Sequence, residues 1–253
     1  MTQANFFLEG EFPYSEECLG NSIHSWLSYQ IALNRNYSLA ESSINVPFGE
    51  YLAQYVSKLE LEKELKYFGS RWTDAFFVRR DAVDTPYYFE FKYTKNGSTR
   101  NQPEKQRVFN DLMRLNSIDD CNSCKFFLMA GKSEEFMTDF EQLIPGKTVR
   151  KNKLPPTNKS PMTVYNSVYN KMFSFDMNAP DRIINVNDPD ILNLITGFDK
   201  EYSKDYRNNP TVPYAQFSQD ISKITTKLVF LSCMGTSARV GMWEITKTQL
   251  ITI

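Results

Sequence analysis

Two short segments of this sequence carry side chains that could perform metal-dependent chemistry. The first, Trp72–Val78, contains Asp74, and the second, Tyr87–Tyr93, contains Glu90 and Lys92. Both segments are rich in aromatic and β-branched residues, and the residues between them include turn formers and a proline, which predicts an antiparallel β-hairpin. Two carboxylates can bind a hard divalent cation through oxygen, and a lysine beside them can stabilise developing negative charge.

Whether the three side chains meet depends on the register of the hairpin. Glu90 and Lys92 lie on one face of their strand because side chains alternate with a period of two. A turn in the middle of the connecting segment would set Asp74 opposite Phe91. A shift of one residue, or a bulge, would set Asp74 beside Glu90 or Lys92 instead. The sequence therefore allows a three-residue site and leaves the pairing open.

Asp74 and the tripeptide Glu90-Phe91-Lys92, with fifteen residues between the two acids, form a pattern that resembles the catalytic motif of the PD-(D/E)xK nuclease superfamily. Thr73 stands where the proline of the family motif would be, which weakens the match. The flanking elements follow the α-β-β-β-α-β order of the family core over about residues 46–140. The resemblance implies an α/β protein with a restriction-endonuclease-like core, in which helices flank a mixed central β-sheet.

The resemblance also implies a function. It predicts a metal-dependent nuclease that hydrolyses DNA phosphodiester bonds, as an endonuclease rather than an exonuclease, with Mg²⁺ as cofactor and Mn²⁺ as its substitute. Asp74 and Glu90 would bind the metal, and Lys92 would orient the attacking water or stabilise charge. Many enzymes of this type act as homodimers, so a homodimer is a further expectation from the resemblance.

Two more residues are candidates by their position relative to the hairpin. In the family, a glutamate from the helix before the sheet often completes the metal site, and Glu50 is the best positional match, with Glu16 or Glu17 as the fallback. Gln106 lies on the predicted helix after Lys92, where some family members place a glutamine near the active site. Solvent-facing helical residues are the alternative interpretation of both Glu50 and Gln106.

Basic residues near the hairpin and in a later loop are candidates for contacts to the phosphate backbone of DNA. The sequence carries a net charge of −1, so it is not a general polyanion binder. A solvated connector is the alternative interpretation of the later loop. The candidate nucleic-acid contacts are Arg79, Arg80 and Arg100 near the hairpin, and Lys147, Arg150, Lys151 and Lys153 in the loop.

Two other functional interpretations stay open. A catalytically inactive nucleic-acid-binding or assembly protein could keep the nuclease fold without cleaving. Alternatively, the motif could be accidental in an unrelated protein. The accidental motif predicts that the carboxylates of Asp74 and Glu90 lie more than about 6 Å apart, too far to share a metal coordinated at about 2.0–2.6 Å.

The remaining periodicity predicts one domain over residues 1–253, with N-terminal helices and additional C-terminal strands and helices around the core. Predicted helices are Ser15–Asn34, Pro47–Leu65, Gln102–Leu115, Ser133–Leu143 and Asp188–Tyr202. Predicted strands beyond the hairpin are Lys66–Phe68, Lys125–Ala130, Met172–Met177, Lys227–Ser232 and Val240–Ile245.

Composition narrows the other possibilities. The chain has 253 residues, of which 41% are hydrophobic, enough for a sizeable core. The sequence has no apolar run long enough to span a bilayer and no signal-peptide pattern, so a cytoplasmic protein without membrane contact is expected. Cys121 and Cys124 form an isolated C-x-x-C motif, and His24 is the single histidine, so a structural zinc site is not expected.

Overall fold

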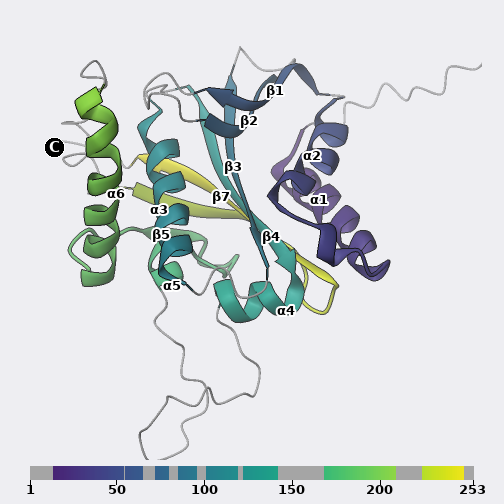
Figure 1. Cartoon of the computed structure of the whole chain (residues 1–253). Coiled ribbons are helices and arrows are strands. Elements are labelled where there is room, and N and C mark those ends of the chain that lie inside the picture. Colours follow the sequence, from purple (N-terminus) through teal and green to yellow (C-terminus); the bar gives the residue numbers. More distant parts are fainter. Residues whose placement is uncertain are drawn as a thin grey trace, which may run out of the picture.

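The computed structural model describes residues 14–53, 55–64, 72–79, 85–95, 101–118, 122–141, 168–208 and 224–247. Within these ranges, seven strands form one mixed sheet in the order β1-β2-β3-β4-β7-β6-β5, with helices on both faces (Figure 1). The strands are β1 (Val56–Glu64), β2 (Trp72–Arg79), β3 (Pro86–Thr94), β4 (Cys124–Lys132), β5 (Asp181–Ile183), β6 (Ile224–Leu231) and β7 (Ala238–Lys247).

Helices precede the first strand and lie between later strands along the chain. They are α1 (Glu16–Ala32), α2 (Asn45–Leu52), α3 (Gln102–Ser117), α4 (Ser133–Glu135), α5 (Val168–Met172) and α6 (Pro189–Asn208). Two 3-10 turns, η1 (Asn36–Ser38) and η2 (Glu41–Ile44), precede α2, and a π-helical segment, η5 (Phe136–Glu141), continues α4. The predicted α/β class, with a mixed sheet flanked by helices, is confirmed.

The strands that carry the candidate residues lie in the first half of the sheet. β1, β2 and β3 pair antiparallel, and β4 then runs parallel to β3 after the crossover through α3. A parallel pair requires such a crossover, and here it places α3 against β3 and β4. From α2 to β4 the order of the larger elements is α-β-β-β-α-β. β7 pairs antiparallel with β4 and extends the sheet toward β6 and β5.

Two of the predicted elements were wrong. The helix predicted over Pro47–Leu65 ends at Leu52, and strand β1 begins four residues later. Tyr55 and Leu59 continue the helical spacing of the apolar residues, but the alternation Leu59-Glu60-Leu61-Glu62 has the period of a strand, and β1 pairs with β2 at the edge of the sheet. The strand predicted at Lys66–Phe68 lies outside the described residues.

The strand predicted over Met172–Met177 is instead the end of α5 followed by an irregular segment. Its aromatic residues pack on a tryptophan rather than joining the sheet. The ring of Phe173 lies 4.9 Å from that of Trp243, and Phe175 lies 5.6 Å from it. The indole Nε1 of Trp243 donates a hydrogen bond to the Ser174 carbonyl at 2.7 Å, which anchors the segment. The short edge strand β5 follows and was not predicted.

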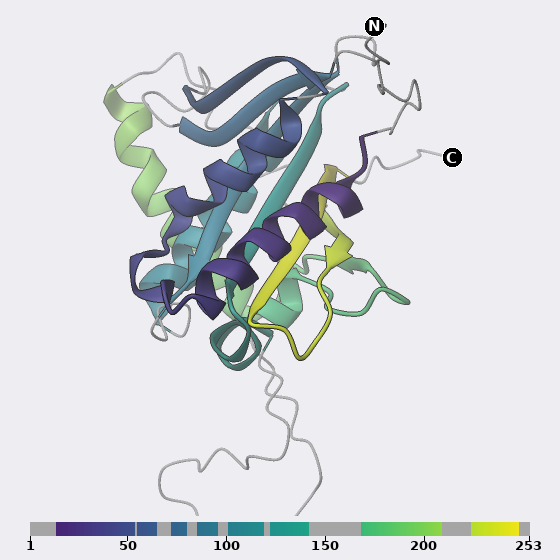
Figure 2. The same ribbon diagram turned by 90° about the vertical axis from the view of Figure 1, so that its right-hand side faces the viewer.

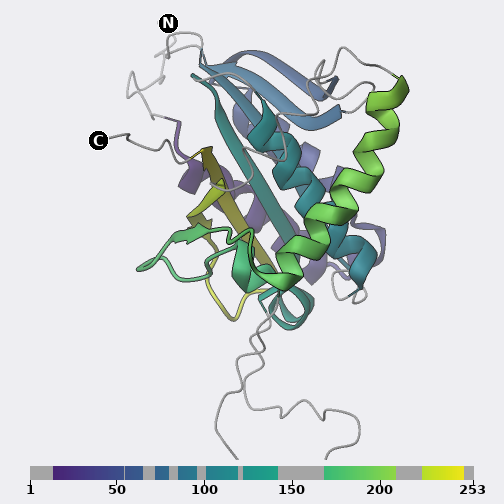
Figure 3. The ribbon, with the colours of Figure 1, turned by 90° about the vertical axis from the view of Figure 1, so that its left-hand side faces the viewer.

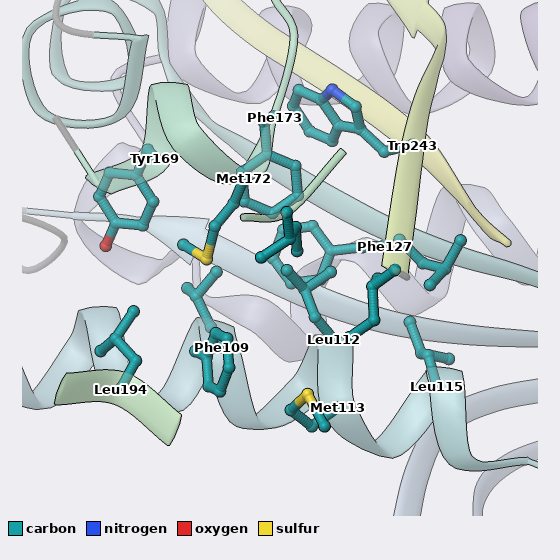
Figure 4. Packing of buried hydrophobic residues seen from close by; sticks show 14 of the residues in the cluster. Phe109, Leu112, Met113, Leu115, Phe127, Tyr169, Met172, Phe173, Leu194 and Trp243 are labelled. Atoms are coloured by element: carbon teal, nitrogen blue, oxygen red, sulfur yellow. The ribbon is translucent and has the colours of Figure 1, made fainter. Parts of the chain in front are cut away.

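Each face of the sheet has its own hydrophobic core. α1 and α2 cover one face (Figure 2). On that face Phe48 packs on Phe89 and Phe91 at ring distances of 4.9 and 5.0 Å. α3 and α6 lie over the other face (Figure 3). There Phe109 and Leu112 of α3 contribute to the buried cluster that includes Phe127, Phe173 and Trp243 (Figure 4). β3 is therefore covered by helices on both faces.

Among the helices of the described residues, none combines the length and the apolar character that crossing a membrane requires.

Gly20 of α1 is required for close packing on the sheet. A Cβ at this position would lie 2.3–2.7 Å from the ring of Phe230 on β6, whereas a Cβ at Gly49 of α2 would meet only Leu59, at 3.8 Å. We expect Gly20→Ala to lower the free energy of unfolding by about 1–3 kcal/mol, because overpacking outweighs the gain in helix propensity. Chemical denaturation is the measurement.

Gly49→Ala is the matched control, since the same substitution in a helix with open space should raise stability by up to about 1 kcal/mol. In a Phe230→Leu background, the loss caused by Gly20→Ala should shrink. Equal effects of alanine at both glycines would contradict the packing explanation.

Candidate active site

Asp74, Glu90 and Lys92 meet at the junction of β2 and β3. The strand pairing sets Ala75 opposite Phe89, one residue from the register that would place Asp74 opposite Phe91. Continued by one step, the observed register brings Asp74 to Glu90. Asp74 and Glu90 lie close enough for the charge of each to affect the pKa of the other.

Local hydrogen bonds fix Asp74 at the end of the β2–β3 ladder. Its Oδ2 accepts a hydrogen bond from the backbone N–H of Phe91 at 2.5 Å. The preceding Thr73 is fully buried, and its hydroxyl donates to the Phe89 carbonyl at 2.7 Å. Thr73 therefore cross-links the two strands beside the site. These side chain to backbone contacts continue the strand pairing where the ladder of backbone hydrogen bonds ends.

Glu90 lies in the interior of the protein, with 1% of its surface exposed. Arg114 of α3 binds both of its carboxylate oxygens, with Nε 3.1 Å from Oε1 and Nη2 3.0 Å from Oε2. Arg114 also contacts Oδ1 of Asp111 at 2.5 Å and donates to the hydroxyl of Tyr202 on α6 at 3.4 Å. A planar guanidinium with several donors suits such a buried carboxylate, because it matches both oxygens at once.

Lys92 is held by carboxylates from two different elements. Its Nζ lies 2.9 Å from Oδ2 of Asp111 on α3 and 3.1 Å from Oε2 of Glu41 on η2. It also donates to the carbonyl of Phe91 at 3.0 Å. Asp111 therefore bridges the two cations, with one oxygen toward Arg114 and the other toward Lys92. We call the set Glu41, Asp74, Glu90, Lys92, Asp111 and Arg114 the acidic cluster.

The acidic cluster holds more negative than positive groups. Among the described residues that form it, four carboxyl groups face two cations, so full ionisation would leave two surplus negative charges. Buried like charges are costly when solvent cannot screen them. The surplus can be relieved by protons or by a divalent cation.

Burial is the main cause of the shifted acid pKa values in the cluster. It raises the pKa of Glu90 well above its ordinary value, with Asp111 adding to the shift, and it raises the pKa of Asp74. The pKa of Glu41 rises to about 7, again chiefly through burial and despite the nearby Lys92. Burial alone would lower the pKa of Lys92, but Asp111, Glu41 and Asp74 outweigh it, so this pKa is raised and the ammonium stays charged.

The donor set fits a divalent cation of the Mg²⁺ type in chemistry and in charge. All candidate ligands are hard oxygens, and the buried Oδ2 of Asp111 forms an ion pair with Lys92 at 2.9 Å without the geometry of a hydrogen bond. Among the described residues, no set of three side chains of histidine, cysteine, aspartate or glutamate is placed to hold one metal ion. Mg²⁺ does not require three, because it is usually bound by one or two carboxylates with water and substrate phosphates.

Other predicted site residues lie elsewhere. Glu50 is exposed on α2, and Glu41, nine residues earlier on η2, is the acid that reaches Lys92. Glu17 is exposed on α1, and Glu16 lies near Glu244 of β7, away from the acidic cluster. Glu41 escaped prediction because its turn precedes Pro47, where the helix was expected to begin.

Gln106 joins two helices and does not face the acidic cluster. Its Nε2 donates to Oδ1 of Asn110 and to the Leu194 carbonyl of α6, both at 2.8 Å. A Cβ at Gly197 would lie 2.1 Å from Oε1 of Gln106, so the glutamine packs directly on the α6 backbone. Asn110 extends this contact by donating to Glu201 at 2.7 Å. The observed role of Gln106 is to attach α6 to α3.

Arg79 is the one predicted nucleic-acid contact within the described residues. It lies five residues beyond Asp74 on β2, which places it about 16 Å along the strand and on the opposite face. Its guanidinium lies over the ring of Tyr14 at 5.1 Å and donates to the Tyr87 hydroxyl at 3.1 Å. The structure therefore does not bring Arg79 to the acidic cluster. The other predicted contacts, Arg80, Arg100, Lys147, Arg150, Lys151 and Lys153, lie outside the described residues.

Comparison with protein-family models, curated proteins and solved structures gives no match for this chain.

Protonation of Glu41 should make stability depend on pH. Its pKa is about 7 in the folded protein against an ordinary value of 4.5, so the folded state binds the proton more tightly. The resulting stabilisation is complete below pH 4.5 and is lost as the pH rises toward 7. We expect the unfolding temperature of the wild type, relative to that of Glu41→Gln, to fall over this range when measured with a metal chelator present.

The control is Glu17→Gln, which removes an exposed acid from α1. Its unfolding temperature should follow the wild type across the same pH range. Parallel curves for the wild type and Glu41→Gln would contradict the assignment of a raised pKa to Glu41.

A structural role for Gln106 makes a separate prediction. Gln106→Leu should lower the free energy of unfolding by about 1 kcal/mol, because it removes the hydrogen bonds between α3 and α6. Isothermal titration with Mn²⁺ should give the same affinity as the wild type. Gln102→Leu, at an exposed position of the same helix, is the control and should leave both quantities unchanged. Loss of Mn²⁺ binding in a folded Gln106→Leu protein would contradict the structural role and support Gln106 as a residue of the metal site.

Proposed function

We propose that this chain is a metal-dependent nuclease of the PD-(D/E)xK type that hydrolyses DNA phosphodiester bonds with Mg²⁺ as its cofactor. One observation carries the proposal: Asp74, Glu90 and Lys92 come together on one face of the β2–β3 pair. The α-β-β-β-α-β order from α2 to β4 supports it, since this is the order expected for a restriction-endonuclease-like core. Endonuclease action and a homodimer remain expectations from the family resemblance.

The acidic cluster suggests a division of roles. Asp74 and Glu90 would hold the cation, and Glu41 of η2 would add a third carboxylate beside them. Bound Mg²⁺ would supply a Lewis acid and lower the pKa of coordinated water. The backbone N–H of Phe91 would keep the Asp74 carboxylate oriented, through the hydrogen bond that it already donates.

Lys92 is suited to electrostatic stabilisation rather than to general base catalysis. Its raised pKa, caused by Asp111, Glu41 and Asp74 despite burial, keeps the ammonium protonated at neutral pH. A charged donor in a site sheltered from water can stabilise negative charge on a phosphate oxygen in the transition state. Lys92 would therefore supply a positive charge beside the scissile phosphate, while Asp111 fixes the position of its ammonium group.

One observation favours a second candidate, a nucleic-acid-binding or assembly protein without cleavage activity. Arg114 occupies both carboxylate oxygens of Glu90, which are the oxygens that a metal would need. If that pair is permanent, the fold persists and the metal site does not form. This candidate predicts DNA binding that is unaffected by divalent cations.

Cleavage of plasmid, linear duplex and single-stranded DNA with Mg²⁺ or Mn²⁺ tests the proposed activity. We expect metal-dependent cleavage by the wild type and a loss of at least about 100-fold in Lys92→Ala, because removing one preorganised donor typically costs that much. Cleavage of closed circular plasmid, which has no ends, would indicate endonuclease action. Circular dichroism must show that the variant is folded, since Lys92 pairs with buried Asp111.

The matched control is Lys171→Ala, which removes a lysine that pairs with Asp188 and Asp190 rather than with the acidic cluster. Its cleavage rate should equal that of the wild type. Absence of cleavage on every substrate, together with no Mn²⁺ binding by calorimetry, would refute the nuclease. DNA binding under those conditions would support the second candidate.

A further inference from the structure

We propose that Arg114 is an internal counter-cation that competes with the divalent metal for Glu90, so that it sets the metal affinity of the site. The inference rests on the proposed function, because it concerns the same carboxylate. Its geometric basis is the two-point contact between the guanidinium of Arg114 and both oxygens of Glu90. The guanidinium uses a lone pair of each oxygen and places a positive charge beside Glu90, so it opposes the approach of a divalent cation to the same carboxylate.

Burial makes the competition strong. Glu90 is 1% exposed, and the side chain of Arg114 is 14% exposed. Removing one partner of a buried ion pair is strongly destabilising, because the remaining charge is left uncompensated. The guanidinium therefore leaves Glu90 only when another cation takes its place. A divalent ion at Glu90 and Asp74 meets this condition and also offsets the surplus negative charge of the acidic cluster.

Arg114 has other partners to hold it after the exchange. Asp111 contacts its Nη2 at 2.5 Å, and the hydroxyl of Tyr202 accepts from Nη1 at 3.4 Å. Asp111 lies one helical turn before Arg114 on α3, so this pair does not depend on the position of β3. Rotation of the guanidinium away from Glu90 would keep it within reach of Asp111. The change can thus be confined to one side chain, with α3 and β3 left in place.

The same contacts explain why Asp111 belongs to the arrangement. It binds Arg114 through Oδ1 and Lys92 through Oδ2. Lys92 stays anchored to Asp111 while Glu90 exchanges one cation for another. The inferred arrangement separates a fixed part, Asp111 with Lys92, from an exchangeable part, Glu90 with Arg114.

The test compares Mn²⁺ binding by isothermal titration in the wild type, Arg114→Gln, and the control Arg107→Gln. Arg107 is an exposed arginine of the same helix that pairs with Glu104. We expect Arg114→Gln to bind Mn²⁺ at least about ten-fold more tightly than the wild type, because the competing cation is gone and more of the protein is competent to bind. Arg107→Gln should match the wild type.

Thermal unfolding gives a second readout. With a chelator, Arg114→Gln should unfold at a lower temperature than the wild type, because Glu90 has lost its partner. Saturating Mn²⁺ should raise the unfolding temperature of Arg114→Gln more than that of the wild type. If Arg114→Gln does not fold, Arg114→Lys replaces it. Lysine keeps the charge but loses the two-point contact, so Mn²⁺ binding about three-fold tighter than in the wild type is expected.

The outcomes separate this inference from the proposed function. Equal or weaker Mn²⁺ binding in the folded Arg114 variant, with normal binding by the wild type, overturns the competition and leaves the nuclease site intact. Binding by the Arg114 variant and not by the wild type supports the competition. No binding in any of the proteins overturns both the competition and the proposed metal site.

Discussion

The buried carboxylate of Glu90 is the constraint on which the rest of the site depends. It lies on β3, which has helices over both faces, so water cannot solvate its charge. A charge in such a position needs a paired cation, and the crossover helix α3 brings Arg114 to it. Asp111, one turn earlier on α3, ties Arg114 to Lys92 and thereby joins β3 and α3 through charge as well as through apolar contact.

The surrounding fold keeps this polar group isolated from solvent. α3 packs against the sheet through Leu112 and its neighbours, while its other side meets α6 (Figures 3 and 4). Gln106 and Asn110 satisfy the polar groups of the α3–α6 contact, and Tyr202 of α6 reaches Arg114. α6 therefore contributes to the acidic cluster through Tyr202 and by covering the helix that supplies its second cation.

The acidic cluster compensates buried charges and also has the properties of a reactive site. Its ion pairs compensate buried charges, yet its surplus of carboxyl groups leaves it able to take up protons or a divalent cation. Buried ionic networks are costly compared with apolar packing of similar volume, so they give little net stability. A cluster of ionisable residues that adds little stability, and whose pKa values are shifted, is typical of a functional site.

The sequence by itself determined the parts of this protein that follow from local periodicity. Alternation along β3 placed Glu90 and Lys92 on one face, and the spacing of Val108, Leu112 and Leu115 marked the buried side of α3. Local patterns did not predict β1, because the apolar residues of this charged edge strand continue the helical spacing of the preceding helix.

Only the tertiary structure decided which distant side chains complete the site. Glu41 is 51 residues from Lys92 in the chain, and the Arg114 guanidinium reaches Glu90 across a gap of 24 residues. No spacing rule links such positions, because their contact depends on how a turn and a helix pack against the sheet. The same packing directed Gln106 toward α6, since a side chain's environment is set by the elements that cover it.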